Sequence, residues 1–281
     1  MYLYPWPGLY LLGRNQSSGN RVRWHVRPKI GIYGLSGCWG EQIVILNCED
    51  QLLDLFGAVD IVDFLGGSSV NDTESRLLIA LVEGSVGHPR EEALLRKVRE
   101  RSDILIACGS CACFGGVAAM DARSPRAEII RQVYGNNGPA ASWDIPPHKP
   151  LSDFVKVDLA IPGCPIEKEE FLRVMSSLLN GDVPVMPAYP VCLECKMKEN
   201  ECLLLTRGLP CAGPVTAAGC GARCPSYNIA CIGCRGPVEE ANMASLERIL
   251  EQKKFELDEI RRKLRLFAAP VLDKLQDRGV Q

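Results

Sequence analysis

The sequence predicts an α/β protein in which a parallel sheet, covered by helices, precedes a small irregular domain and a C-terminal helix. Short, nearly continuous apolar runs alternate with helical patterns between residues 29 and 179, as expected for strands buried on both faces of a parallel sheet. Eight of the 14 cysteines fall between residues 190 and 236, a stretch with little other apolar content. Metal–thiolate bonds are expected to replace a hydrophobic core there.

Length and composition limit the number of domains and the classes of partner that this chain can be expected to have. The chain has 281 residues, 23% of them charged, and a net charge of −2. Nothing in this balance indicates a nucleic-acid partner or an anionic membrane surface. We expect four parts: an N-terminal extension (1–28), the sheet domain (29–185), the cysteine-rich domain (186–237) and a C-terminal helical segment (238–281).

The first 28 residues are interpreted as an extension and not as a secretion signal. Pro5 and Pro7 interrupt their apolar stretch, which has no basic region before it and no clear small-residue cleavage site after it. No run approaches the ~18 apolar residues of a membrane span. The prediction is therefore a cytoplasmic, reduced protein without a membrane span.

The apolar runs define the expected elements in chain order. The expected strands cover residues 29–35, 58–65, 77–84, 103–109 and 154–163. The expected helices cover residues 41–56, 90–102 and 166–179, the last with Pro165 just before it, a favourable helix-start position. Residues 121–150 are expected to be a loop-rich insertion.

The cysteine-rich stretch divides into two sets of four, each with one C-x-x-C pair. The sets are Cys192, Cys195, Cys202 and Cys211, then Cys220, Cys224, Cys231 and Cys234. Four thiolates serve one [4Fe–4S] cube, one per iron, so the first interpretation is two such clusters. Two four-cysteine zinc sites use the same spacing. Disulfides require an oxidising compartment, and free structural cysteines are not expected at this density.

Further cysteines follow the expected strands. Cys38 follows the first, Cys111 the fourth and Cys164 the fifth, each in a glycine-containing turn. Ligands bind beyond the carboxyl ends of strands in an open α/β sheet, so these three cysteines predict one shared site. Cys48, Cys108 and Cys113 fit equally well as small buried apolar residues. No G-x-G-x-x-G opens a helix and no P-loop is present, so a nucleotide site is unsupported.

The motifs together resemble those of the small, electron-transferring subunits of cytoplasmic [NiFe] hydrogenases, of the sulfhydrogenase and F420-linked kinds. They are G-x-C-x-x-x-G-G at 109–116, P-G-C-P at 162–165, VEGSV at 82–86, YPVCLEC, CAGPVT and CIGCRG. The resemblance covers about residues 29–270. It implies a flavodoxin-like domain with a proximal [4Fe–4S] cluster, then a medial cluster at the second cysteine set and a distal cluster at the first, three clusters in all.

One position departs from the family pattern. The first motif of the family is usually C-x-G-C, whereas this chain has Cys38-Trp39-Gly40-Glu41. We expect Glu41 to be the fourth proximal ligand beside Cys38, Cys111 and Cys164, because a carboxylate can bind iron although it is a harder donor than a thiolate. The alternatives are a cluster lacking one iron, substitution by Cys108 or Cys113, and a Glu41 that only favours the helix start.

Two further features each allow two interpretations. Glu83 ends a buried strand, where a charge is costly unless it is paired; it is either a satisfied structural carboxylate or a group of the large-subunit interface. Apolar residues recur at helical spacing in 238–279, which indicates a helix packed on its own domain or a dock for a partner. Pro270 is expected to end or bend this helix.

The resulting expectation is a hydrogenase subunit that conducts electrons and has no catalytic site of its own. The resemblance implies two partners: a large subunit that carries the Ni–Fe centre, and a flavin- or ferredoxin-type subunit that exchanges electrons at the distal end. The alternatives are the iron–sulfur subunit of a complex I-like oxidoreductase and a non-enzymatic zinc protein. Complex I-like chains usually carry a proximal cluster alone, so the eight-cysteine domain argues against that assignment.

Overall fold

The computed structural model describes residues 27–69, 71–120, 124–136, 146–255 and 257–278. Most of the expected extension (1–28) and much of the expected loop-rich insertion (121–150) lie outside these residues. The centre of the fold is a five-stranded sheet in the order β2-β1-β3-β4-β5, with every neighbouring pair parallel. This is the flavodoxin-like order, as the resemblance implied. The strands are β1 Lys29–Gly34, β2 Asp60–Phe64, β3 Leu77–Glu83, β4 Ser102–Cys108 and β5 Leu159–Ile161.

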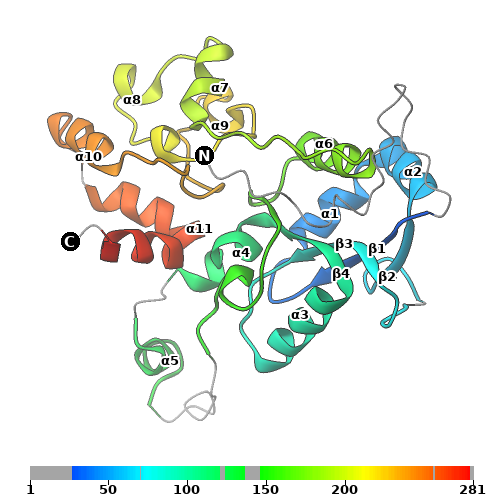
Figure 1. Ribbon diagram of the computed structural model, residues 1–281. Coiled ribbons are helices and arrows are strands. Elements are labelled where there is room, and N and C mark those ends of the chain that lie inside the picture. The colour runs from blue at the N-terminus through cyan, green and yellow to red at the C-terminus, as the bar shows by residue number, and fades with distance from the viewer. Residues whose placement is uncertain (1–26, 70, 121–123, 137–145, 256, 279–281) are drawn as a thin grey trace.

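Helices cover both faces of the sheet, as expected for strands without polar alternation (Figure 1). On one face lie α1 (Gly40–Leu46), α2 (Glu49–Ala58) and α6 (Lys168–Leu179). On the other lie α3 (Pro89–Arg101) and α4 (Gly109–Phe114). Ile79 and Phe171 are fully buried in the first core, and Leu77 and Leu95 in the second.

Three sequence expectations need correction. The expected helix over 41–56 is two helices, because the chain turns at Asn47 and Cys48. The apolar residues Ile43, Leu46 and Leu53 of this segment are exposed and contribute little to the core. Ile45 is the residue of α1 that is buried in the core. The fifth strand keeps only residues 159–161 of the expected 154–163. The expected loop-rich insertion contains a helix, α5 (Arg126–Tyr134).

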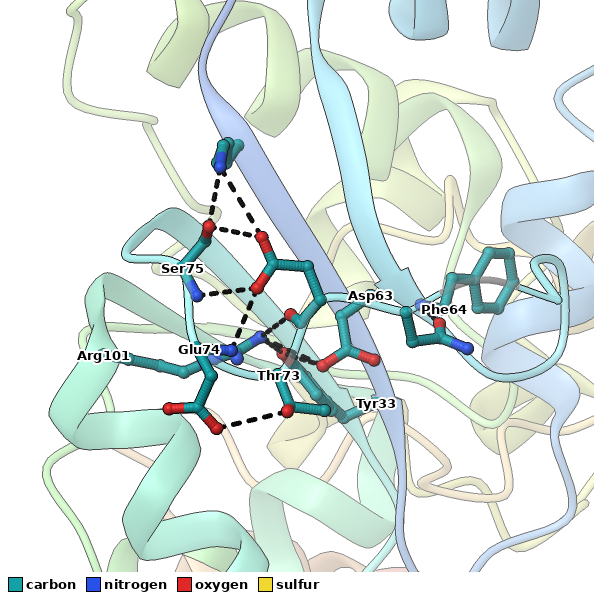
Figure 2. A network of polar contacts seen from close by, with 10 residues as sticks. Tyr33, Asp63, Phe64, Thr73, Glu74, Ser75 and Arg101 are labelled. Atoms are coloured by element: carbon teal, nitrogen blue, oxygen red, sulfur yellow. Dashed lines mark hydrogen bonds and ion pairs between the residues drawn. The ribbon is translucent and has the colours of Figure 1, made fainter.

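A buried polar network ties one edge of the sheet to the end of α3 (Figure 2). Tyr33 donates a hydrogen bond to Asp63 Oδ2 at 2.9 Å. Arg101 Nη2 lies 2.5 Å from the Tyr33 hydroxyl and 3.0 Å from both Asp63 Oδ2 and the Asp72 carbonyl oxygen. The Tyr33 ring lies over Gly31, where a Cβ would be 2.5 Å from the hydroxyl oxygen. The network therefore fastens β1, β2 and the loop that follows β2.

The cysteine-rich half has its own smaller core. Its short helices are α7 (Val191–Met197), α8 (Leu203–Thr206) and α9 (Arg223–Ser226). Val215, Leu250 and Leu264 lie in this core together with Cys211 and Cys231. The sequence predicts almost no apolar core here, but the C-terminal helices supply one.

The C-terminal segment forms two helices, α10 (Met243–Gln252) and α11 (Leu257–Arg278), beside the cysteine-rich half (Figure 1). Leu246, Leu250, Ile260 and Leu264 are buried against that half, so their apolar stripe packs on its own chain. Helix α11 bends at Ala268, two residues before Pro270, which confirms the expected bend. None of the described helices has the length and apolar character needed to cross a membrane.

Candidate iron–sulfur sites

The three strand-end cysteines converge at the carboxyl edge of the sheet. Cys38 lies between β1 and α1, Cys111 lies in α4 directly after β4, and Cys164 lies in the turn after β5. Burial raises the pKa of the Cys111 thiol to about 11, and the neighbouring Glu41, Cys164 and Cys38 contribute to this rise. One side chain thus has the other three expected proximal ligands as close neighbours.

Short backbone contacts hold these turns together. The Ser110 N–H donates to the Gly163 carbonyl at 2.7 Å, which joins the Cys111 turn to the Cys164 turn. A Cβ on Gly116 would lie 2.4 Å from Cys111 Sγ, and its φ of +62° also suits glycine. A side chain at position 116 would displace the Cys111 sulfur. Gly116 therefore makes room for the Cys111 thiol.

Glu41 lies in the first turn of α1 and is only 4% exposed. Its carboxyl covers Gly109, where a Cβ would be 2.1 Å from Oε1. Burial, then a hydrogen bond to Glu83 and the charge of Glu83, raise the pKa of Glu41 to about 8. Glu83 is 2% exposed and accepts a hydrogen bond from Gln42 at 2.7 Å. The two carboxyls therefore form a buried pair beside the strand-end cysteines.

The other sheet-domain cysteines bond to their own backbone. Cys48 is fully buried and its thiol lies 3.5 Å from the Val44 carbonyl. The Cys113 thiol lies 3.5 Å from the Ala107 carbonyl, and the Cys108 thiol 3.9 Å from that of Ile106. Burial raises the pKa of both Cys108 and Cys113 well above the ordinary range. These contacts fit small core residues better than substitute ligands.

The first set of four cysteines gathers around α7 and α8. Burial raises the pKa of Cys192 to about 11, and the neighbouring Cys211, Cys195 and Cys202 contribute to this rise. Gly213 lies against two of these sulfurs, since a Cβ there would be 3.4 Å from Cys211 Sγ and 3.5 Å from Cys192 Sγ. The spacing in sequence is thus matched by proximity in space.

Three cysteines of the second set line a cavity. The cavity has a volume of about 310 Å³, and its walls include Cys220, Cys224 and Cys234 of this set together with Cys164 of the strand-end group. Burial raises the pKa of Cys234 to about 11, and Cys220 and Cys224 are among the neighbours that raise it. A space walled by several thiols is chemically suited to an iron–sulfur cube.

The fourth member of this set, Cys231, borders the first set as well. Its N–H lies 3.3 Å from Cys211 Sγ, and its carbonyl accepts the Ala212 N–H at 3.0 Å. Burial raises the pKa of Cys231 to about 12, and Cys211 and Cys234 are both among the neighbours that raise it. The three groups of cysteines therefore follow one another, with Cys164 beside the second set and Cys231 beside the first.

Within the described ranges, no three His, Cys, Asp or Glu side chains come close enough to hold a single metal ion. A cube separates its ligands more widely, because each thiolate binds a different iron. Four donors per group, nearly all thiols, fit iron–sulfur clusters by the softness of sulfur. The thiols must lose their protons to bind iron as thiolates, and the positive irons would offset the raised pKa values.

Sequence reasoning missed the charged residues that join these groups. Arg235 is 1% exposed and donates to the Pro162 carbonyl at 2.6 Å, the Ala218 carbonyl at 2.8 Å and Glu170 Oε1 at 2.8 Å. Glu194 bonds to the backbone around Cys220. The position of Arg235 directly after Cys234 was a signal, but no pattern named its partners, which lie 17 to 73 residues away.

Comparison with known proteins gives a consistent set of relatives. The family model described as NADH ubiquinone oxidoreductase, 20 Kd subunit, matches residues 38–178. The delta subunit of sulfhydrogenase 2 from Pyrococcus furiosus is 44% identical over 240 residues, which cover 85% of this chain and 99% of that protein. A vhu subunit of the F420-non-reducing hydrogenase from Methanocaldococcus jannaschii is 34% identical over 239 residues, covering 76% and 83% respectively.

A solved structure extends this likeness to the fold. The chain resembles a chain of an NAD+-reducing [NiFe]-hydrogenase in the H2-reduced state, with a TM-score of 0.52 and 26% identity. The match covers 58% of this chain and 96% of the other.

Proposed function

The chain belongs to the family of [NiFe] hydrogenase small subunits, and on that premise we propose that it relays electrons through three [4Fe–4S] clusters. The proximal cluster is assigned to Cys38, Glu41, Cys111 and Cys164. The medial cluster is assigned to Cys220, Cys224, Cys231 and Cys234, and the distal cluster to Cys192, Cys195, Cys202 and Cys211. The clusters, when bound, supply one-electron redox chemistry.

One observation carries this proposal: the three ligand groups are contiguous. Cys164 shares a cavity with Cys220, Cys224 and Cys234, and the Cys231 N–H lies 3.3 Å from Cys211 Sγ. A relay needs redox groups next to one another, and this order supports a path from the sheet edge to α7. The chain's own residues hold the clusters, limit their exposure to water and tune their potentials.

The proposed partners occupy the two ends of this path. At the proximal end Cys38 and Cys164 are exposed, and beside them Trp39, just before α1, and Ile43 on α1 are 45% and 52% exposed. Exposed apolar side chains around a redox site suit a protein partner, here the large subunit with the Ni–Fe centre. At the distal end Cys202 is exposed, which suits a flavin- or ferredoxin-type subunit. We propose a cytoplasmic location because the assigned cluster ligands are thiolates, which a reducing compartment keeps free of disulfides.

Two alternatives make different predictions. The matched family model is described as a subunit of NADH ubiquinone oxidoreductase, but it ends at residue 178, before both cysteine sets of the C-terminal half. A complex I-like role therefore leaves eight cysteines without a purpose. A zinc protein with two four-cysteine sites remains a chemical alternative that metal analysis separates.

The test uses the intact complex purified without oxygen. Three cubes predict about twelve irons per copy of this chain, nickel in a separate subunit, and little zinc. H2-dependent dye reduction is expected from the complex and not from this chain alone. Two zinc ions per chain with negligible iron would overturn the cluster proposal. H2 uptake by the nickel-free chain would overturn the proposal that a separate large subunit reacts with H2 while this chain only conducts electrons.

A further inference from the structure

Glu194 belongs to the distal C-x-E-C turn of α7 but bonds to the medial segment. It lies between Cys192 and Cys195, whereas its carboxylate accepts the Gly219 N–H at 2.9 Å and the Ala222 N–H at 3.1 Å. Oε2 lies 4.0 Å from Cys220 Sγ. The Glu194 carboxylate thus binds one amide before Cys220 and one amide after it in the chain.

The same segment is held from its other side by a buried ion pair. Arg235 donates to the Ala218 carbonyl at 2.8 Å and to Glu170 Oε1 at 2.8 Å. Both charged side chains are only 2% exposed. Gly219 lies against this pair, since a Cβ there would be 2.3 Å from Arg235 Nη2 and 2.5 Å from Glu170 Oε1. The segment 218–222, which carries Cys220, is therefore fixed between two charged groups.

We propose that Glu194 is a positioning residue that fixes Cys220 and lowers the reduction potential of the medial cluster relative to its neighbours. This inference rests on the proposed three-cluster relay. It assigns a role at the medial cluster to Glu194, although Glu194 lies in sequence between Cys192 and Cys195 of the distal set.

Two effects of Glu194 act in the same direction. Amide N–H groups that donate to cluster sulfurs favour the reduced state, but the Gly219 and Ala222 amides donate to Glu194 instead. A carboxylate beside a cluster also repels the added electron. The Arg235 charge is matched by Glu170, whereas the hydrogen bonds to Glu194 come from neutral amides. Glu194 therefore places a negative charge beside Cys220 that the Arg235–Glu170 pair does not offset.

Lys198 provides an opposite charge in the same place. It lies one turn after Glu194, lines the same cavity as Cys220, and its Nζ would be 3.2 Å from a Cβ on Gly221. Its ammonium favours an added electron. Replacing Lys198 and replacing Glu194 should therefore move the medial potential in opposite directions, which separates charge from loss of packing.

The experiment is a redox titration of the intact complex, monitored by electron paramagnetic resonance. Glu194→Gln keeps one oxygen acceptor and removes the charge, so the medial potential should shift upward by more than the distal potential, with iron content unchanged. Lys198→Met should shift the medial potential downward. Glu194→Ala frees both amides, and about four irons should be lost preferentially on brief exposure to oxygen. Glu201→Gln is the control, because Glu201 bonds to Thr206 and Arg207; it should leave the medial potential unchanged.

The outcomes separate this inference from the function on which it rests. Three clusters in every variant, with the medial potential of Glu194→Gln unchanged, overturn the role of Glu194 and leave the relay intact. A change in Glu194→Gln that is confined to the potential of the distal cluster has the same consequence. A wild-type complex without a cluster at the Cys220 set overturns both. The inference is supported if the reduction potential of the medial cluster shifts upward in Glu194→Gln and downward in Lys198→Met.

Discussion

The carboxyls of Glu41 in α1 and Glu83 in β3 lie buried beside each other near the strand-end cysteines, and the two residues are only 4% and 2% exposed. Two carboxyls in contact do not both ionise, so the pair holds a proton near neutral pH. Glu83 Oε1 also accepts a hydrogen bond from Gln42 at 2.7 Å. Burial, and then the neighbouring Glu83 carboxyl, raise the pKa of Glu41 to about 8.

Replacing Glu41 tests its assignment as the fourth proximal ligand. Glu41→Cys should keep the iron content and move only the proximal potential, because thiolate replaces a harder oxygen donor. Glu41→Ala should make the proximal cluster labile while the medial and distal clusters persist. Iron analysis and a redox titration check both. The assignment is wrong if Glu41→Ala retains a proximal cluster of unaltered potential and stability.

Glu83→Gln is the matched control for the buried pair. The amide keeps the size of the side chain and removes the charge that faces Glu41. If Glu83 acts only as a neighbour, the proximal cluster should stay at full iron content with a small upward shift of its potential, because one negative charge is lost. Loss of that cluster would instead make Glu83 part of its support.

Gly109→Ala should disturb Glu41 without touching a cysteine. The added Cβ would lie 2.1 Å from Glu41 Oε1, and φ at this position is +83°. Both the collision and the left-handed backbone disfavour alanine, at a cost of about 1–3 kcal/mol. We expect the variant to shift the proximal potential and to make the proximal cluster more labile, as predicted for Glu41→Ala. A proximal potential equal to that of the wild type would mean that the Glu41 position does not matter to the cluster.

Gly219→Ala should destabilise the medial segment. Its Cβ would collide with the Arg235–Glu170 pair, and φ is +119°. We expect a loss of about 1–3 kcal/mol and preferential loss of the medial signal on warming. Gly57→Ala in α2 is the control, because nothing lies within 4 Å of its Cβ; a helical alanine there should stabilise by about 0.5–1 kcal/mol. Equal stability of the two variants would contradict the prediction.

The network of Figure 2 should contribute stability and not redox tuning. Arg101→Met leaves the buried Asp63 carboxylate without its cation and should cost about 3–5 kcal/mol. Tyr33→Phe removes one hydroxyl and should cost about 1 kcal/mol. Urea unfolding of the cluster-loaded chain measures both. The three cluster potentials should stay unchanged, and a shift in any of them would show that the network reaches the redox groups.

Much of the fold followed from local patterns. The runs at residues 29–35, 77–84 and 103–109 became β1, β3 and β4 within a residue or two of the expected ends, because strands buried on both faces are apolar throughout. The helix after β1 was less predictable. It breaks at Asn47 and Cys48, and no proline or glycine marks this break in the sequence.

The grouping of the cysteines was also predictable, since C-x-x-C pairs and strand-end positions follow from spacing and topology. The residues that join the groups were not. Arg235 meets Glu170 across 65 residues, and Glu194 reaches amides 25 and 28 residues away.

The sequence by itself determined which residues have the chemistry to hold clusters and which strands bring three of them to one edge. Only the tertiary structure decided how the sites join, that the C-terminal helices complete the core around the second half, and that Glu41 contacts Glu83. The physical reason is distance along the chain. Thiol spacing and strand periodicity are local patterns that short stretches of sequence contain. A buried charge instead pairs with a residue far away in the chain, and no periodic pattern in the sequence identifies that residue.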